Sequence, residues 1–224
     1  MLFGDSYEPV AWEQARRQKA VSKELIKAAR NFPDKVRFYT LWLQMQRINK
    51  DFIEGDIAEL GVYQGETARL LHLMAPERSL HLFDTFGGFT STDLQAESGE
   101  AATYTTKNFA DTSISKVLKK VGGDPGKISI HAWYFPQSAS ECGELRYALV
   151  SIDVDLYIPT KAGLEYFYPR LSAGGVILIH DYNHKWEGLQ RAVDEFLVNS
   201  NEYLTPVADM EGTVMIIKHQ HDNP

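Results

Sequence analysis

The spacing of hydrophobic and polar positions changes near residue 56. Before it, residues 10–30 and 35–50 carry apolar residues at helical spacing, and a proline in the short stretch between them stops the helix. After it, short apolar runs alternate with stretches of helical spacing. We therefore expect a helical N-terminal cap or lid over residues 1–50 and one α/β domain over residues 51–224.

The alternation predicts the order of the elements. The apolar runs that predict strands are residues 56–62, 79–86, 127–133, 148–157, 174–182 and 212–219. The segments that predict helices are 66–75, 111–122, capped by Asp111 or Thr112, then 160–171, opening at Pro159-Thr160, and 187–200. This order favours a mostly parallel, doubly wound sheet. Ligands bind such sheets at the carboxyl ends of the strands, so these ends are where we look for chemistry.

A glycine-containing loop follows the first predicted strand. It reads Glu59-Leu60-Gly61-Val62-Tyr63-Gln64-Gly65-Glu66-Thr67 and leads directly into a helix. The glycines permit a tight turn and close backbone approach to a ligand, and a helix N-terminus favours a carboxylate or another anion. The loop lacks the G-x-G-x-x-G of dinucleotide-binding proteins. Its E-x-G-x-x-x-G form suits a cofactor without a pyrophosphate.

The second predicted strand ends in Asp84-Thr85, where an acidic residue is expected to accept hydrogen bonds from ribose hydroxyls. Trp133, after the third strand, either flanks an adenine or packs in the core. The alternative is that the glycines only make a turn and Asp84 only caps the next segment. Together the features favour a nucleoside-type cofactor. The residues expected to bind it are Glu59, Gly61, Tyr63, Gly65, Thr67, Asp84, Thr85, Trp133 and Asp153.

Acidic residues gather at the ends of two further strands. Asp153 and Asp155 point to the same face if the strand continues through them, and like charges so placed call for a cation. His180 and Asp181 end the next strand, roughly 5 Å away if the two strands pair. Asp153, His180 and Asp181 would make a site suited to Mg²⁺. Alternatively, the acids cap the helices that follow.

Such a site is able to activate an alcohol as a nucleophile. An aliphatic hydroxyl is a poor nucleophile until its proton leaves, and a metal ion that holds its oxygen lowers its pKa. A neighbouring carboxylate then accepts the proton, and we assign this role to Asp155. Lys161 and His184 are candidate helpers, with a solvated helix face as the alternative for both.

Composition and charge exclude some classes of site and ligand. The single cysteine, Cys142, excludes an internal disulfide and a multi-cysteine zinc site, and its simplest interpretation is an incidental thiol. A net charge of −7 without a basic stripe argues against nucleic acid and favours a small-molecule substrate. No run approaches the roughly 18 apolar residues of a membrane span, and the N-terminus has no export signal, so we expect a cytoplasmic protein.

Two segments keep alternative interpretations. Residues 86–106 are acidic and poorly patterned, which fits a substrate lid that orders on binding or a plain surface loop. The aromatic-rich residues 38–43 pack on their own domain or on a partner in a homodimer.

The blocks DIAELGVYQGETA, HLFDTFGGF, NFADTS, SIDVDLY, YPRLSAGGVILIHDY and RAVDEF together resemble the TylF family, the macrocin and novobiocin-type sugar O-methyltransferases. The resemblance runs from about Arg37 to about Lys218. It implies a Rossmann-like class I methyltransferase fold with a helical lid, S-adenosylmethionine as methyl donor, Mg²⁺, and a sugar-like acceptor. It further implies that Asp153 is a metal ligand, that Asp155 is the general base, and that Glu59, Gly61, Tyr63 and Asp84 contact the cofactor.

One position departs from the family pattern. The family usually carries two adjacent aspartates where this chain has His180-Asp181. A histidine there either lowers the affinity for Mg²⁺ or shifts the preference toward Mn²⁺ or another transition metal. Two alternatives stay open, a metal-independent methyltransferase and a protein that binds S-adenosylmethionine without transferring methyl. A nicotinamide-dependent oxidoreductase ranks last because the glycine fingerprint is missing.

Overall fold

The structure, a computed structural model, describes residues 7–219; residues 1–6 of the predicted cap and 220–224 of the predicted domain lie outside the described residues. The helices are α1 (Val10–Arg17), α2 (Lys23–Asn31), α3 (Lys35–Lys50), α4 (Glu66–Met74), α5 (Ser91–Leu94), α6 (Ile114–Val121), α7 (Tyr157–Arg170) and α8 (Glu187–Val198), with 3₁₀ turns η1 (Ala101–Thr103), η2 (Pro125–Lys127) and η3 (Gln137–Ala139). The strands are β1 (Asp56–Leu60), β2 (Leu80–Asp84), β3 (Ile128–Ala132), β4 (Tyr147–Ile152), β5 (Leu171–Ile179), β6 (Thr205–Pro206) and β7 (Val214–Ile217).

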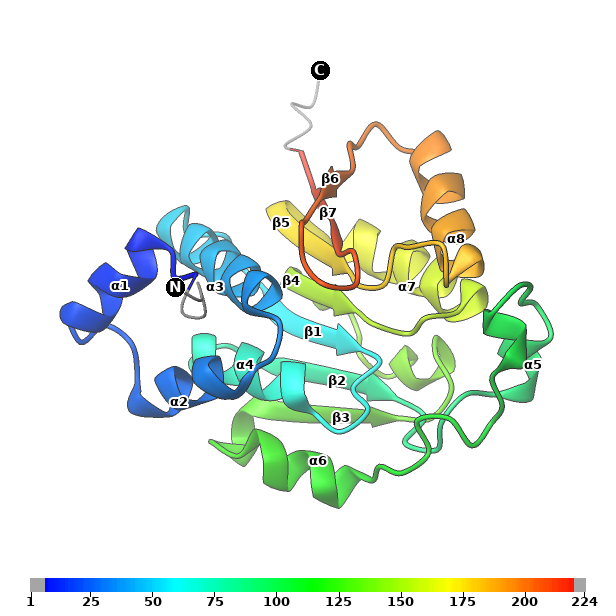
Figure 1. Cartoon of the computed structure of the whole chain (residues 1–224), viewed down its shortest axis with the longest axis horizontal. Helices are drawn as coiled ribbons and strands as arrows, with labels where there is room; N and C mark the ends of the chain where they lie inside the picture. Colours follow the sequence, from blue (N-terminus) through cyan, green and yellow to red (C-terminus); the bar gives the residue numbers. More distant parts are fainter. Residues whose placement is uncertain (1–6, 220–224) are drawn as a thin grey trace, which may run out of the picture.

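The strands form one sheet in the order β3-β2-β1-β4-β5-β7-β6 (Figure 1). β1 to β5 pair in parallel, whereas β7 runs antiparallel to β5 and β6 antiparallel to β7. The predicted mostly parallel, doubly wound α/β fold is confirmed. β6 is a strand that the pattern does not predict, because it has only two residues. Strand order reverses between β1 and β4, which places the topological switch point there.

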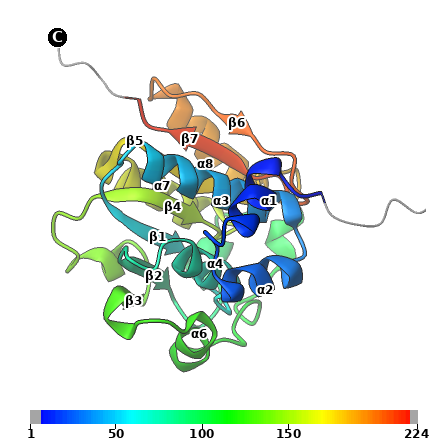
Figure 2. The same cartoon turned by 90° about the vertical axis from the view of Figure 1, so that its left-hand side faces the viewer.

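Helices cover both faces of the sheet, and successive strand residues face opposite sides. In β1, Ile57 belongs to a hydrophobic cluster with α1–α4 and α6, whereas Ala58 and Leu60 belong to a second cluster with α7 and α8. Figure 2 views the molecule from the side of α1–α3. Because α1–α3 belong to the same hydrophobic cluster as Ile57, core packing holds them against that face of the sheet. The division of the chain at residue 50 into two units stays a prediction.

Local capping explains where two helices depart from the predicted bounds, and a tolerated proline allows the earlier start of a third. Residues 10–30 form two helices, because Ser22 accepts a hydrogen bond from Leu25 N at 3.1 Å and starts α2. The N-cap of α6 is Ser113, one residue beyond the predicted choices. α7 begins at Tyr157, ahead of the predicted start, because Pro159 is tolerated within the first turn of a helix.

The aromatic-rich segment 38–43 packs within its own chain. Phe38, Tyr39, Leu41 and Trp42 are all buried, and the ring of Trp12 meets that of Trp42 edge-on at 5.1 Å. The first of the two predicted roles of the segment is thus the observed one, and a homodimer stays a prediction. Within residues 7–219, no helix is long and apolar enough to span a membrane.

A pair of histidines on β2 and β3 makes the free energy of unfolding depend on pH in the acidic range. His131 Nε2 lies 3.0 Å from His81 Nδ1, and its ring stacks on Phe83. Burial, and then the charge of His81, lower the pKa of His131 to about 4. The unfolded chain titrates near the ordinary value of about 6.5, so between these values it binds more protons than the folded chain. The free energy of unfolding should therefore fall as the pH drops from about 6.5 to about 4.

We expect His131→Gln to flatten this dependence, because glutamine does not ionise. Urea unfolding at several pH values across that window measures it. Some dependence should remain, because burial also lowers the pKa of His72. The control is His184→Gln at an exposed histidine, which should follow the unmodified chain. Parallel pH curves for His131→Gln and the unmodified chain would contradict the assignment.

Candidate active site

The loop after β1 makes a very close approach to the rest of the molecule at Gly61. Gly61 has a φ of +89°, which L side chains rarely adopt, and a Cβ built on it lies 1.9 Å from the carbonyl oxygen of Asp153. Tyr63 also has a positive φ, of 47°. The loop therefore requires glycine at position 61, and it runs directly against the residues that follow β4.

Helix α4 begins immediately after this loop. Its N-cap, Gly65, has a φ of +80°, and a Cβ there lies 3.2 Å from Cγ1 of Val117 in α6. Gly65 thus serves the packing of α4 against α6, and it does not line the cavity described below. Thr67, in the first turn of α4, is buried and does line it.

Asp84, at the end of β2, organises the loop through its carboxylate. Oδ2 accepts hydrogen bonds from the backbone N–H groups of Val62 at 2.7 Å and Tyr63 at 2.8 Å. Oδ1 accepts one from Phe86 N at 2.6 Å. Carboxylate oxygens offer about four lone-pair sites, so acceptor capacity remains for a ligand. The next residue, Thr85, donates its hydroxyl to the carbonyl of Gly88 at 2.8 Å.

Glu59, in β1, is a buried carboxyl group with one oxygen unused. It is 1 % exposed and lines the cavity, and within residues 7–219 its Oε2 has no hydrogen-bond partner. Burial, and then the nearby charge of Asp153, raise the pKa of Glu59 well above its usual value. A buried unpaired acceptor costs about 1–3 kcal/mol, so this oxygen is suited to a ligand that brings a donor.

The acidic residues after β4 stand in a loop and not on the strand. β4 ends at Ile152, so the predicted continuation of the strand to residue 157 is wrong. The reason is local, because Asp155 has a φ of +63° and the chain turns there into α7. β4 and β5 pair in parallel, and the end of β5 brings His180 and Asp181 alongside. His180 Nδ1 lies 2.5 Å from Oδ2 of Asp181 and 3.3 Å from Oδ1 of Asp153.

The carboxyl groups of this cluster differ in their affinity for protons. Burial, then the charges of Asp153 and Asp181, raise the pKa of Asp155 well above its usual value. Burial acts in the same direction on Asp153, but Arg37 and His180 outweigh it and hold its pKa below the usual range. Burial alone would lower the pKa of His180, yet Asp153 and Asp181 raise it to about 10. Asp153 is thus the ion-paired carboxylate, and Asp155 is the one that readily takes up a proton.

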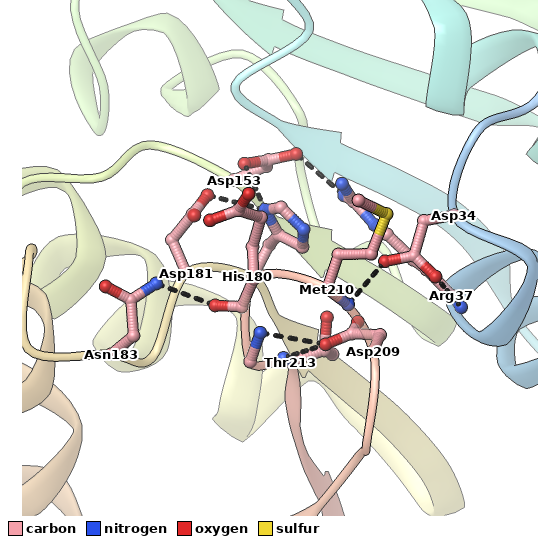
Figure 3. A network of polar contacts seen from close by, with 11 residues as sticks. Asp34, Arg37, Asp153, His180, Asp181, Asn183, Asp209, Met210 and Thr213 are labelled. Atoms are coloured by element: carbon pink, nitrogen blue, oxygen red, sulfur yellow. Dashed lines mark hydrogen bonds and ion pairs between the residues drawn. The ribbon is translucent and has the colours of Figure 1, made fainter.

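The N-terminal helices contribute Arg37 and Asp34 to the same network (Figure 3). Arg37 Nη2 lies 2.7 Å from Oδ2 of Asp153, and both side chains are largely buried. Asp34 is the N-cap of α3, and its Oδ1 accepts a hydrogen bond from Arg37 N at 2.9 Å. Its Oδ2 accepts one from Met210 N at 2.7 Å, in the loop before β7. The network therefore joins the start of α3 and the loop before β7 to the carboxyl ends of β4 and β5.

One cavity of about 730 Å³ connects the loop after β1 with this network. It is lined by the predicted residues Glu59, Gly61, Tyr63, Thr67, Asp84, Thr85, Trp133, Asp153, Asp155, His180 and Asp181. The cavity wall also includes residues that the sequence reasoning missed, namely Asp34, Arg37, Phe89, Asp93, Phe109, Met210 and Glu211. The Asp34 N-cap after Pro33 is a signal that was available, whereas the others become neighbours only through the fold.

Trp133 stands at the cavity and not in the core. Trp133 is 74 % exposed and has a φ of 109°, and its backbone N–H donates to the carbonyl of Asp84 at 3.1 Å. The core-packing alternative for Trp133 is therefore wrong. Lys161 contacts Tyr157 and Glu195 on the outside of α7, so its helix-face alternative is the observed one.

His184 is exposed, and its side chain does not line the cavity either. Cys142 lies 3.4 Å from Nδ1 of His131, away from the cavity, and burial raises the pKa of its thiol. Lys161, His184 and Cys142 are therefore not placed to act on a ligand in the cavity.

Residues 86–106 are folded and attached to α7 and α8. They contain α5 and η1, and Glu97 Oε1 accepts a hydrogen bond from Tyr157 N at 2.7 Å, at the start of α7. Tyr104 packs on Trp186 with ring centres 4.9 Å apart. Phe89 and Phe109 form an aromatic wall with Tyr63. A lid function for the segment stays a prediction.

The donor set after β4 and β5 fits a divalent cation. Asp153, His180 and Asp181 each offer one ligand atom, and these atoms lie within 4.8 Å of one another. Two carboxylates and one imidazole suit Mn²⁺-type ions as well as Mg²⁺. An ion there would take over contacts that Asp153 now makes with Arg37 and that Asp181 makes with His180.

Comparison with known proteins agrees with this picture. A Streptomyces olivaceus enzyme, 8-demethyl-8-(2,3-dimethoxy-alpha-L-rhamnosyl)-tetracenomycin-C 4'-O-methyltransferase, is 22% identical over 185 residues, or 78% of this chain and 70% of that protein. The solved structure of the O-methyltransferase NovP has a TM-score of 0.73 at 19% identity, covering 83% of this chain and 81% of its own. That of CalS11, a calicheamicin methyltransferase, has a TM-score of 0.63 at 21% identity, covering 95% and 94%.

The two solved structures establish a shared fold, that of Rossmann-like methyltransferases. The family comparison goes further, because the model for macrocin O-methyltransferases matches residues 6–218. The chain belongs to the TylF family of macrocin O-methyltransferases, and it is therefore an O-methyltransferase that uses S-adenosylmethionine.

Proposed function

We propose that this enzyme methylates a sugar hydroxyl of a glycosylated small molecule, with Asp155 as the general base. The observation that carries the proposal is that one cavity joins the loop after β1 to the carboxyl group of Asp155. The acceptor class is supported by the Streptomyces olivaceus relative, whose name specifies the 4'-oxygen of a rhamnosyl group.

The cofactor is assigned to the part of the cavity between the loop after β1 and Trp133. Glu59 Oε2, buried and without a hydrogen-bond partner in the described part of the chain, would accept a hydrogen bond from the α-amino group of S-adenosylmethionine. Asp84 retains acceptor capacity for the ribose hydroxyls, and the exposed Trp133 would stack on the adenine. Gly61 also lines the cavity, and its backbone would lie beside the methionine moiety.

In the transfer step, the acceptor oxygen attacks the methyl carbon of the sulfonium. A carbon–oxygen bond forms while the carbon–sulfur bond breaks, and the sulfur keeps the electron pair to give S-adenosylhomocysteine. The hydroxyl proton passes to Asp155. Because the pKa of Asp155 is raised, the ionised carboxylate is a stronger base than an ordinary aspartate.

We assign divalent-metal assistance to Asp153, His180 and Asp181, which would hold the ion. A bound Mg²⁺ or Mn²⁺ supplies Lewis acidity that favours the alkoxide form of the acceptor. The metal-independent alternative is favoured by one observation, the ion pair between Arg37 and Asp153, which already brings a positive charge into the cluster. Activity in the presence of a chelator separates the two, because only the metal-independent enzyme keeps its rate.

Calorimetric titration with S-adenosylhomocysteine tests the cofactor assignment. We expect binding by the unmodified chain, with or without Mg²⁺ or Mn²⁺, and a loss of affinity in Glu59→Gln. Glu165→Gln, an exposed residue of α7, is the matched control and should bind normally. Absence of binding in the unmodified chain under all conditions would refute the proposal. Sugars and glycosides are then screened as methyl acceptors.

Trp133→Ala should weaken S-adenosylhomocysteine binding by about tenfold, because one aromatic stacking contact contributes roughly 1–3 kcal/mol. Its thermal stability should stay unchanged, since the side chain is 74 % exposed. Tyr203→Ala removes another ring, 80 % exposed and outside the cavity wall, and should alter neither quantity. Normal affinity in Trp133→Ala would remove this residue from the cofactor site.

A further inference from the structure

Arg37 brings a permanent positive charge into the acidic cluster. A guanidinium stays protonated at any pH at which the protein is folded. Its Nη2 lies 2.7 Å from Oδ2 of Asp153, with side chains 11 % and 23 % exposed respectively. The other Asp153 oxygen faces His180 Nδ1 at 3.3 Å. Both oxygens of Asp153 are therefore engaged by cationic or donor groups of the chain itself.

The backbone of Arg37 is held as firmly as its side chain. Asp34, 8 % exposed, accepts hydrogen bonds from Arg37 N at 2.9 Å and Met210 N at 2.7 Å. Phe38 and Leu41, which follow on α3, are fully packed in the core. Figure 3 shows the resulting chain of contacts from Met210 through Asp34 and Arg37 to Asp153 and His180. These contacts fix the position of the backbone from which the guanidinium reaches Asp153.

We propose that Arg37 is a positioning residue that sets the affinity of this site for divalent cations, by competing with the ion for the carboxylate of Asp153. The inference rests on the proposed metal site. A cation bound by Asp153, His180 and Asp181 meets the repulsion of the guanidinium and must share or displace its contact with Oδ2. The guanidinium of Arg37, in α3, and the metal ion thus compete for the carboxylate of Asp153.

A gain of metal affinity on removing Arg37 distinguishes this role from a structural one. Loss of a merely structural ion pair loosens a site and weakens its ligands, whereas loss of a competitor tightens metal binding. We expect Arg37→Gln to bind Mn²⁺ about tenfold or more tightly, because a unit charge acts strongly on a divalent ion at the effective dielectric of a protein. Arg37→Lys keeps the charge and should stay within about threefold of the unmodified chain.

The measurement is Mn²⁺ titration of metal-stripped protein, followed by the electron paramagnetic resonance of free Mn²⁺. Arg30→Gln, an exposed arginine of α2, is the matched control for net charge and should not change the affinity. Equal or weaker Mn²⁺ binding in Arg37→Gln overturns the proposal, as does an equal gain in Arg30→Gln. If no variant binds Mn²⁺, both this inference and the metal site fail, while S-adenosylhomocysteine titration of the same samples judges the cofactor site separately.

Should Arg37→Gln not fold, hydrogen exchange on the unmodified chain provides the test. Saturation with Mn²⁺ should then speed amide exchange over residues 35–38, because the ion weakens the contact through which the Arg37 side chain ties the start of α3 to Asp153. Unchanged exchange in saturating Mn²⁺ overturns the competition.

Discussion

Asp155→Asn should lower kcat for methyl transfer by about 100-fold or more, because a positioned general base typically contributes on the order of 10²–10⁴ to the rate. Asparagine has nearly the same shape but cannot accept the hydroxyl proton. Asp155 is buried and does not organise the loop after β1, which Asp84 holds instead. The affinity for S-adenosylhomocysteine should therefore stay close to that of the unmodified enzyme.

Single-turnover kinetics with the identified acceptor measures the effect on the chemical step. Asp194→Asn is the matched control, because Asp194 is exposed on α8 and accepts from the Tyr182 hydroxyl, a bond that asparagine can also accept. This control should keep its full rate. A near-normal rate in Asp155→Asn would move the base elsewhere in the cluster, and loss of cofactor binding would make the residue structural.

Gly61→Ala should abolish cofactor binding and destabilise the fold by at least about 3 kcal/mol. Strained backbone alone costs on the order of 1–3 kcal/mol, and the steric overlap adds to it. The overlap is severe, because the new Cβ would lie 1.9 Å from the carbonyl oxygen of Asp153 and 2.6 Å from its carbonyl carbon. Both contacts are to backbone, which has no rotamer with which to yield. Urea unfolding and S-adenosylhomocysteine titration measure the two effects.

Gly143→Ala separates backbone strain from overlap. Gly143 has a φ of +61°, and a Cβ there meets no atom of residues 7–219 within 4 Å. It should cost about 1–2 kcal/mol from backbone strain and leave cofactor binding intact. Equal destabilisation by the two substitutions would show that Gly61 is required for its φ alone and not for its proximity to Asp153.

Sequence reasoning found the parts of the site that lie at strand ends. Glu59, Asp84 and Asp181 belong to or directly follow apolar runs, so a polar residue there is a local signal of a ligand site. Parallel pairing then brings these ends to one edge of the sheet. The course of the chain between Asp153 and Asp155 was not predictable in this way, because a single left-handed residue redirects the backbone where the residue types still resemble a strand.

The position of Arg37 in the site could not be predicted from a local sequence pattern. It lies 116 residues from Asp153 in the chain, and an arginine on an amphipathic helix normally reaches solvent. The structure of residues 86–106 could not be predicted for a related reason. Their anchors, such as Glu97 on the start of α7, are contacts with distant helices and leave no periodicity in the segment itself.

The hydrogen bond between Asp34 and Met210 has a consequence for how the protein is made. The two residues are 176 positions apart, so at about 5–20 residues per second the ribosome needs roughly 10–35 seconds to synthesise the second after the first. During that interval Oδ1 of Asp34 can already cap α3 through Arg37 N, but Oδ2 lacks its partner Met210 N. The acidic cluster is thus assembled only in the second half of synthesis, and a nascent chain that stops before residue 153 leaves the guanidinium of Arg37 without its carboxylate partner.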